Sequence, residues 1–223
     1  MNKVKLIGAT TGFFLLAQTT SMAFSFGVGV TGGGAMLEAS GTETLRTNGN
    51  TNTKSKRAGS AIGSGYAQVQ FGSGWTLGAE YFAGGVTLKG KRADVYDLRN
   101  VTSETGDQIA KARTENLISW YAETPGFTRL GLYAKAGYSE FDIKTKENLV
   151  TQGTYDDQSG DGWMYGIGFK QGDPEGGMQV KFEVSYTDFD SITFTNSSDS
   201  TGNSTIKVEP ELWQGKLAIG YNF

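Results

Sequence analysis

The sequence contains no cysteine and no histidine among its 223 residues. The missing cysteine excludes a disulfide framework and thiolate metal sites. The missing histidine removes the commonest general base, and with it the Ser-His and Cys-His dyads of nucleophilic catalysis. Proline is scarce, at 3 residues, while aromatic residues make up 12% of the chain. Neither a collagen nor a disordered Pro-rich tail is therefore expected.

Long apolar runs are also scarce, and the mean hydropathy of −0.35 argues against a bundle of transmembrane helices. A membrane β-barrel stays possible, because its lining and loops are polar. One apolar run, over residues 6–17, follows Lys3 and Lys5 and precedes the small residues of Ser21-Met22-Ala23. This order predicts a secretory signal peptide over residues 1–23, followed by one barrel domain over residues 24–223.

The chain after residue 23 carries 18 positive and 23 negative side chains. This balance speaks against nucleic acid as a partner. Its apolar residues alternate with polar or small ones, most clearly from Met178 to Thr187, which is the period of a β-strand. The same alternation recurs over Leu130–Ser139, Trp163–Lys170 and Trp213–Phe223.

Short turn signals divide this chain at intervals of roughly 50 residues. They are Gly72-Ser73-Gly74, Thr124-Pro125-Gly126 and the glycine-rich segment Gly172–Gly177. Four units result, each a strand, a long polar segment and a returning strand. The fold predicted is all-β, an eight-stranded antiparallel up-and-down transmembrane β-barrel with short turns at one end. Long outer loops are expected over Ser40–Ser60, Gly90–Arg113, Thr145–Asp161 and Ser191–Ser204.

The two faces of these strands differ in a way that suits a small membrane barrel. Bulky apolar residues on one face, with aromatics near strand ends, fit lipid and its interfacial girdles. Small residues on the other face fit a narrow lumen, and the 33 glycines would allow tight closure. Only the strand near Leu117–Ala122 is ambiguous, because Trp120 and Tyr121 fall on opposite faces.

Charged residues on the small-residue face are assigned to the lumen, where they must pair across the barrel. The resulting network is either a static polar core or a gate that opens by exchanging partners. The predicted members are Glu80, Glu123, Lys135, Lys170, Lys181, Glu183 and Lys216.

Two weaker signals lie in the expected outer loops. The segment Asp157–Gly162 matches the start of a calcium loop, but Gly168 stands where a bidentate Glu is needed, so a polar turn is the alternative. Lys54, Lys56 and Arg57 are suited either to lipopolysaccharide phosphates or to a solvated loop. No cofactor, resident metal or catalytic residue is assigned, and an enzyme is not expected.

The C-terminal segment resembles the assembly signal of bacterial outer-membrane proteins. The alternating residues that carry the resemblance are Leu217, Ile219, Tyr221 and Phe223, while Ala218 departs from the preferred glycine. With the signal peptide and eight strands, the chain resembles the small outer-membrane proteins of the OmpA/OmpX type, with a porin-like β-barrel domain. The resemblance implies a Gram-negative outer membrane, export through the secretion translocon and insertion by the barrel assembly machinery.

These observations favour a monomeric structural or surface-interaction protein of the cell envelope. It would contact outer-membrane lipid and lipopolysaccharide, and host or phage through its loops. The first alternative is a narrow passive channel for ions or small solutes. The second is a secreted soluble barrel that carries an apolar ligand. Conductance separates the first two functions, and fractionation separates the third.

Overall fold

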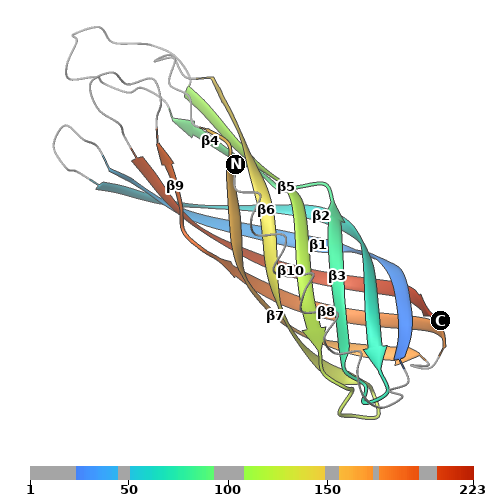
Figure 1. The fold of residues 1–223 in the computed structure, drawn as a ribbon. Coiled ribbons are helices and arrows are strands. Elements are labelled where there is room, and N and C mark those ends of the chain that lie inside the picture. The colour runs from blue at the N-terminus through green and yellow to red at the C-terminus, as the bar shows by residue number, and fades with distance from the viewer. Residues whose placement is uncertain (1–23, 45–50, 93–107, 149–155, 173–175, 196–204) are drawn as a thin grey trace, which may run out of the picture.

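The computed structural model describes residues 24–44, 51–92, 108–148, 156–172, 176–195 and 205–223, and these residues form a long, closed β-barrel (Figure 1). The predicted signal peptide, residues 1–23, lies outside the described residues. The strands are β1 (Phe24–Thr44), β2 (Thr51–Phe71), β3 (Thr76–Ala83), β4 (Thr87–Arg92), β5 (Gln108–Glu123), β6 (Leu132–Asn148), β7 (Gln158–Gly172), β8 (Gly177–Phe189), β9 (Ile192–Thr195) and β10 (Thr205–Asn222).

All neighbouring strands pair antiparallel, and β1 pairs with β10 from Gly27↔Asn222 to Thr44↔Thr205 to close the ring. Strand β4 continues β3 along the same neighbour, β5, and β9 continues β8 along β10. The ring therefore has eight strand positions, two of which are each filled by two consecutive strands, and this confirms the predicted fold. Closure satisfies the backbone groups that an open edge would leave unpaired.

The end of the barrel that carries the short turns, here called the turn end, also holds the C-terminus (Figure 1). One tight turn joins β2 to β3, with the amide of Phe71 donating to the carbonyl of Trp75 at 2.9 Å. The amide of Phe223 donates to the carbonyl of Phe26 at 2.7 Å, which fixes the last residue against the first strand. The opposite end of the barrel, toward which the long antiparallel strand pairs extend, is here called the hairpin end.

The predicted long loops are wrong over much of their length, because strands occupy them. Strands β1 and β2 stay paired up to Thr44↔Thr51, so most of Ser40–Ser60 is a β-ladder. The pairs Arg92↔Gln108 and Ile109↔Asn148 likewise extend the neighbouring hairpins into segments expected as loops. Both faces of these strand segments carry polar and charged residues, so the sequence shows no alternation of apolar and polar residues there.

Toward the hairpin end the ring opens into two sheets. Strand β3 pairs with β2 only as far as Gly63↔Ala83, and β4 pairs with β5 alone in the described part of the chain. Strand β9 similarly pairs with β10 and leaves β7. One sheet is therefore β9-β10-β1-β2 and the other is β4-β5-β6-β7. In Figure 1 they diverge as the blue and red strands and the green and yellow strands.

Two local features explain the interruptions. Gly84 has φ +102, and a Cβ on Gly85 would lie 1.5 Å from the carbonyl oxygen of Thr114, so only glycine fits where β3 gives way to β4. A bulge between Glu115 and Ile118, with Asn116 at φ 53, shifts the register of β5. Beyond the bulge, Trp120 faces outward and Tyr121 is buried, which resolves the ambiguous strand.

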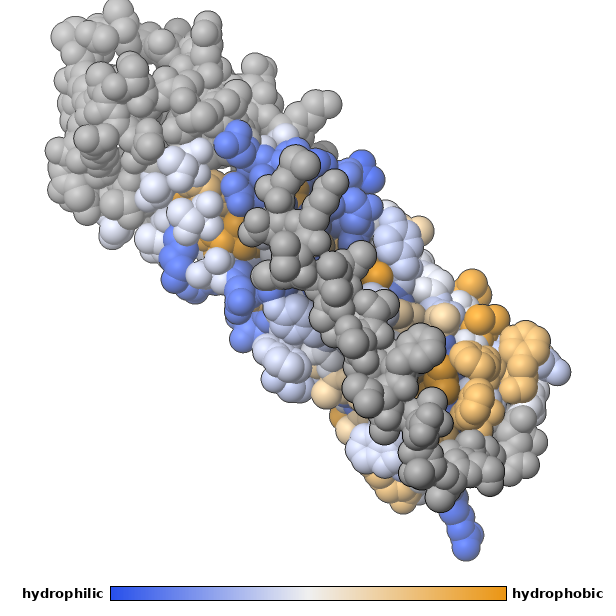
Figure 2. All heavy atoms as spheres, viewed as in Figure 1, coloured by the Kyte–Doolittle hydropathy of each residue, from blue (hydrophilic) through white to orange (hydrophobic). Residues whose placement is uncertain are grey.

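The outer wall carries a belt of exposed apolar residues bounded by aromatics. Near the turn end, an aromatic rim comprises Phe24, Trp75, Phe127, Phe169, Tyr221 and Phe223. The other rim, here called the upper aromatic girdle, comprises Tyr81, Trp120, Tyr138, Trp163, Tyr186 and Trp213. On the face seen in Figure 2, hydrophobic residues gather toward the turn end and hydrophilic ones beyond them. From Trp213 to Phe223 the belt spans about 33 Å of strand, or about 25 Å along the axis at a tilt near 40°.

Candidate functional site

The interior of the barrel changes character along its axis, and the inward face of β8 shows the order. From the turn end it presents amides, then charges, then hydroxyls and finally an aromatic ring. The residues are Gln179, Lys181, Glu183, Ser185, Thr187 and Phe189, all of them buried. The barrel is thus closed inside by successive layers of different chemistry.

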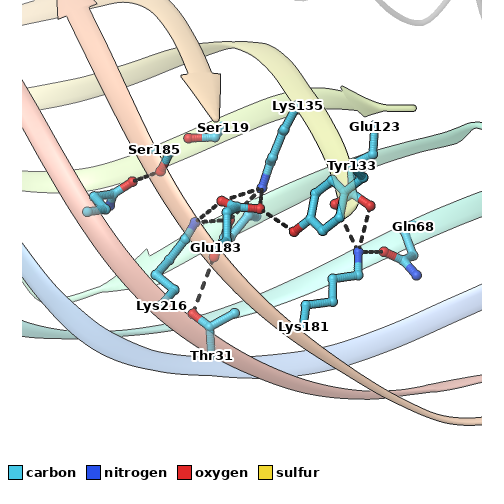
Figure 3. A network of polar contacts seen from close by, with 12 residues as sticks. Thr31, Gln68, Ser119, Glu123, Tyr133, Lys135, Lys181, Glu183, Ser185 and Lys216 are labelled. Atoms are coloured by element: carbon cyan, nitrogen blue, oxygen red, sulfur yellow. Dashed lines mark hydrogen bonds and ion pairs between the residues drawn. The ribbon is translucent and has the colours of Figure 1, made fainter. Parts of the chain in front are cut away.

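Four charges form a neutral cluster in the middle of the barrel (Figure 3). Lys135 Nζ lies 3.0 and 3.1 Å from the two carboxylate oxygens of Glu183 and 3.5 Å from Glu80 Oε2. Lys216 Nζ lies 2.7 Å from Glu80 Oε2 and 3.1 Å from Glu183 Oε1. Each lysine therefore contacts both carboxylates. These residues come from β3, β6, β8 and β10, so the cluster joins opposite walls.

Hydroxyl groups complete the coordination of this cluster. Ser64 donates to Glu80 Oε1 at 2.6 Å, and Tyr133 donates to Glu183 Oε2 at 2.9 Å. The ring of Tyr121 lies 3.9 Å from Lys135 Nζ, a cation–π distance. Buried charges are tolerated only when paired and hydrogen-bonded, and these conditions are met here.

A second charge cluster lies closer to the turn end. Lys181 Nζ lies 2.9 Å from both oxygens of Glu123 and 2.7 Å from the side-chain oxygen of Gln68. Lys170 approaches Glu123 at 3.7 Å and donates to the carbonyl of Thr124 at 3.0 Å. Beneath this cluster, Gln68 also donates to Gln179 at 3.0 Å.

All seven residues that the sequence assigned to the lumen lie in these two clusters, with their side chains at most 9% exposed. Lys170 is the most exposed of them and lies at the edge of the network. The tyrosines that support the network were missed, although Tyr133 shares the face of Lys135 in the sequence. A phenol on an otherwise small and polar face is the signal that could have identified them.

A small cavity remains between the two clusters. It offers about 20 Å³ to the centre of a water molecule and is lined by groups from both clusters, with Tyr66 beside them. This space is enough for one or two water molecules. The charged layer therefore fills the bore almost completely.

An apolar layer lies above the charges, toward the hairpin end, and the sequence reading missed it. It is here called the upper compartment and comprises Ala35, Leu37, Val86, Phe141, Ile143, Phe189, Ile192, Phe194 and Leu212. It packs between the two sheets into which the ring opens. The rings of Phe141 and Phe189 meet edge to face, with centroids 4.5 Å apart. Ile192 and Phe194 fall in a segment expected as a loop, where their spacing of two was the available signal.

The residues of the C-terminal resemblance face the opposite way. Leu217, Ile219, Tyr221 and Phe223 are 47–71% exposed on the outer wall. All four belong to the belt, and Leu217, Ile219 and Tyr221 pair along β1 and β8. Their alternation is therefore what lipid contact by the last strand requires.

The two loop signals have structural explanations in the described residues. Asp157 accepts from Lys144 Nζ at 2.8 Å and from the amide of Thr145 at 3.0 Å, while Asp161 accepts from the hydroxyl of Tyr138. No group of three or more acidic side chains that could hold a metal ion occurs in the described part of the chain. Lys54, Lys56 and Arg57 are exposed on β2, and Arg57 pairs with Glu38 at 2.8 Å.

No described helix has the length and apolar character needed to cross a membrane.

The fold and the filled interior define a class, the small eight-stranded barrels with a lipid-suited outer wall. Solved structures of outer-membrane proteins share this fold. OprG from Pseudomonas aeruginosa is 16% identical with a TM-score of 0.52, and the match covers 91% of this chain and 97% of that one. No family model matches the chain, and no curated protein matches its sequence.

Two further structures show weaker similarity. The outer-membrane protein AlkL, determined in DMPC lipid bilayers, is 12% identical with a TM-score of 0.47, covering 93% of this chain and 94% of that one. Ail of Yersinia pestis, in complex with the heparin analogue sucrose octasulfate, is 14% identical with a TM-score of 0.39, covering 89% of this chain and 99% of that one.

Proposed function

We propose that this protein is an outer-membrane barrel that serves the cell envelope through its structure and its outward hairpins rather than through conduction. The belt supports the membrane location. Its height of about 25 Å and its two aromatic rims match what a bilayer requires of a barrel wall. In water, an exposed apolar surface of this extent would lead to aggregation.

The filled interior is the observation that supports a barrel that does not conduct ions. The seven charged side chains connect opposite walls, and the amides beneath them and the upper compartment above add further obstruction. A permeating ion would have to break contacts of 2.7–3.1 Å between buried opposite charges. The bore is too narrow to admit the water that would hydrate the separated charges, so the lost ion pairs are not compensated.

Planar-bilayer recording tests this proposal. The wild-type barrel should give no conductance steps above baseline. The variant Glu80→Ala/Lys216→Ala removes one charge of each sign, leaves the Lys135–Glu183 pair in place and should give steps. The control Glu38→Ala/Arg57→Ala removes an exposed pair and should stay silent. Regular steps from the wild-type protein would overturn the closed-lumen proposal.

A narrow passive channel is the second candidate, and the water-sized cavity between the charge clusters is the observation that favours it. If this candidate is right, wild-type conductance should be small and should change when Lys181, which lines the cavity, is replaced by Met. Fractionation tests the membrane location independently. Recovery of the protein from the soluble periplasm without detergent would exclude both candidates and favour a soluble carrier.

The hairpin end supports the surface role in one respect. Lys54 and Lys56 on one face of β2, and Arg57 on the other, are exposed beyond the belt at a height suited to lipopolysaccharide phosphates. Replacing all three with Gln should weaken retention on lipopolysaccharide-coated beads at low salt, while Lys207→Gln on β10 serves as the single-charge control. Equal retention of all proteins would remove lipopolysaccharide from the proposed partners. Insertion by the barrel assembly machinery stays a proposal that rests on the C-terminal resemblance.

A further inference from the structure

The upper compartment contains a pocket that the proposed envelope role does not use. Its apolar lining includes Leu37, Phe82, Phe141 and Leu212, and Gln214 forms its polar floor. The space between the lining atoms, mouth included, is about 440 Å³. Only about 30 Å³ of it admits the centre of a water molecule, which is room for about two or three waters, so a chain of methylene groups enters this narrow pocket only as the lining side chains move apart.

Gln214 gives this pocket a chemical requirement. Its side chain is 3% exposed, and its Oε1 accepts a hydrogen bond from Ser185 at 3.4 Å. Its Nε2 is buried and has no hydrogen-bond partner among the described residues. A buried donor left without a partner costs free energy, which a bound acceptor would recover. The pocket therefore calls for a ligand with an apolar body and one hydrogen-bond acceptor.

The mouth of the pocket lies in the wall of the barrel. Ala83, Gly84 and Gly85 line the pocket where the ladder between β2 and β3 ends. Ala83 and Gly84 are exposed, and neither glycine has a side chain to cover the opening.

The height of the pocket follows from its neighbours in sequence. Phe82 adjoins Tyr81, and Leu212 and Gln214 flank Trp213, and both aromatics belong to the upper aromatic girdle. The mouth therefore opens at the level where the belt meets water, within reach of molecules dissolved in either phase.

We propose that this pocket binds a single-chain amphiphile, an alkyl chain with one uncharged terminal acceptor such as a hydroxyl oxygen. The chain lies among Leu37, Phe141 and Leu212, and the acceptor oxygen receives a hydrogen bond from Gln214 Nε2. The charged layer lies beneath this floor, so the ligand binds in the compartment and does not pass through the barrel. The ligand comes either from the bilayer or from the surrounding water.

Photolabelling of the refolded protein in nanodiscs tests the site. The probe is 1-decanol with a diazirine at the end of its chain, and cross-linked residues are mapped by mass spectrometry. Saturable labelling of peptides that contain residues 35–37, 82–86 or 212–214 is expected. Labelling that rises linearly with probe concentration, or that falls only on outward residues of the belt, would overturn the proposal.

Two variants separate the apolar chain from the acceptor. Ala35→Leu fills the pocket from β1 and should abolish saturable labelling, whereas Ala67→Leu adds the same methyl groups on the exposed face of β2 and should leave it unchanged. Gln214→Leu keeps the volume but removes the donor. In the wild type, 1-decanol should compete for the probe roughly fivefold better than it does in Gln214→Leu, while decane competes equally in both.

A wild-type level of labelling in Ala35→Leu, or equal decanol competition in the two proteins, would refute the site. Thermal unfolding followed by circular dichroism shows that each variant is folded before labelling. Two further arms identify the source of the ligand. The probe is either incorporated in the bilayer before reconstitution or added from water to protein held in amphipol without lipid. Labelling in the first arm alone assigns the bilayer, and labelling in both assigns water as well.

Discussion

Glu183 accepts hydrogen bonds from three residues inside the barrel, and its replacement by Gln is the most direct test of how the charged layer works. Lys135, Lys216 and Tyr133 all reach its carboxylate at 2.9–3.1 Å, and the residue is 5% exposed. Glu183→Gln keeps the shape of the side chain and removes one negative charge. Two lysines are then left with Glu80 as their shared carboxylate.

The expected cost follows from the geometry. Two unit charges about 3 Å apart attract by about 5 kcal/mol at an effective dielectric constant near 20. Breaking a buried pair by removing one partner costs about 3–5 kcal/mol, because the other charge stays buried. We therefore expect Glu183→Gln to lower the free energy of unfolding by about 4 kcal/mol, and Lys135→Met by a similar amount.

The double variant Glu183→Gln/Lys135→Met restores charge balance and leaves the Lys216–Glu80 pair, at 2.7 Å, in place. Its cost should be about 5 kcal/mol, only slightly above that of one single variant, which gives a coupling free energy of about 3 kcal/mol in the double-mutant cycle. The exposed pair supplies the control, since the side chains of Arg57 and Glu38 are 67% and 23% exposed. Arg57→Gln should leave the unfolding transition nearly unchanged, because solvent screens an exposed pair.

Urea unfolding from lipid vesicles, followed by tryptophan fluorescence, measures these quantities. All 4 tryptophans lie in the belt, at 45–58% exposure in the isolated barrel, so their emission reports transfer from lipid to water. Strictly additive costs in the cycle, or a loss below about 1 kcal/mol for Glu183→Gln, would refute the reasoning. Either result would mean that water screens the interior charges.

Three further predictions concern other parts of the barrel. Gly29→Ala should destabilise by about 1–3 kcal/mol in the same unfolding assay, because its Cβ would lie 2.5 Å from an aromatic ring and a backbone oxygen, whereas Gly34→Ala, with open space around it, should be neutral or slightly stabilising. The Lys144 ammonium lowers the pKa of Asp157 in the outer hairpin, so Lys144→Met should raise that pKa toward its ordinary value in an NMR titration; an unchanged value would show that the pair does not form. In the wild type this contact should be present above the ordinary Asp pKa and should be lost as pH falls through the lowered value. Deletion of Phe223 should reduce membrane insertion in cells, and normal insertion would contradict its assigned role in assembly.

The seven lumen charges were predictable because a strand alternates its faces with a fixed period of two. Once Val180 and Phe182 are assigned to lipid, Lys181 must face the interior, and the same argument applies to each charged position. The alternation of faces does not give the position of a side chain along the barrel axis, however. It could not show which lysine would meet which carboxylate, because partners such as Lys135 and Glu183 lie on different strands and meet across the bore.

Apart from the spacing of Ile192 and Phe194, the upper compartment was beyond sequence reasoning for a related reason. Leu37, Phe141 and Phe189 occupy inward positions, where apolar side chains contradict the rule of a polar lumen. The rule changes above the belt, where the ring opens into two sheets that pack face to face as in a soluble sandwich. Only the pairing of β4 with β5 alone, and of β9 with β10 alone, reveals that change.

The order of the two interior layers determines what the barrel can do. A molecule that reaches the upper compartment meets the hydroxyls and then the charged layer beneath it, where every buried ammonium already has a carboxylate. An alkyl chain gains nothing by advancing, because it would displace ion pairs without replacing their hydrogen bonds. A small ion gains nothing from the other side, because an apolar compartment follows. Under the proposed function the two layers exclude different solutes, and a ligand bound above the charges has no exit through the charged layer.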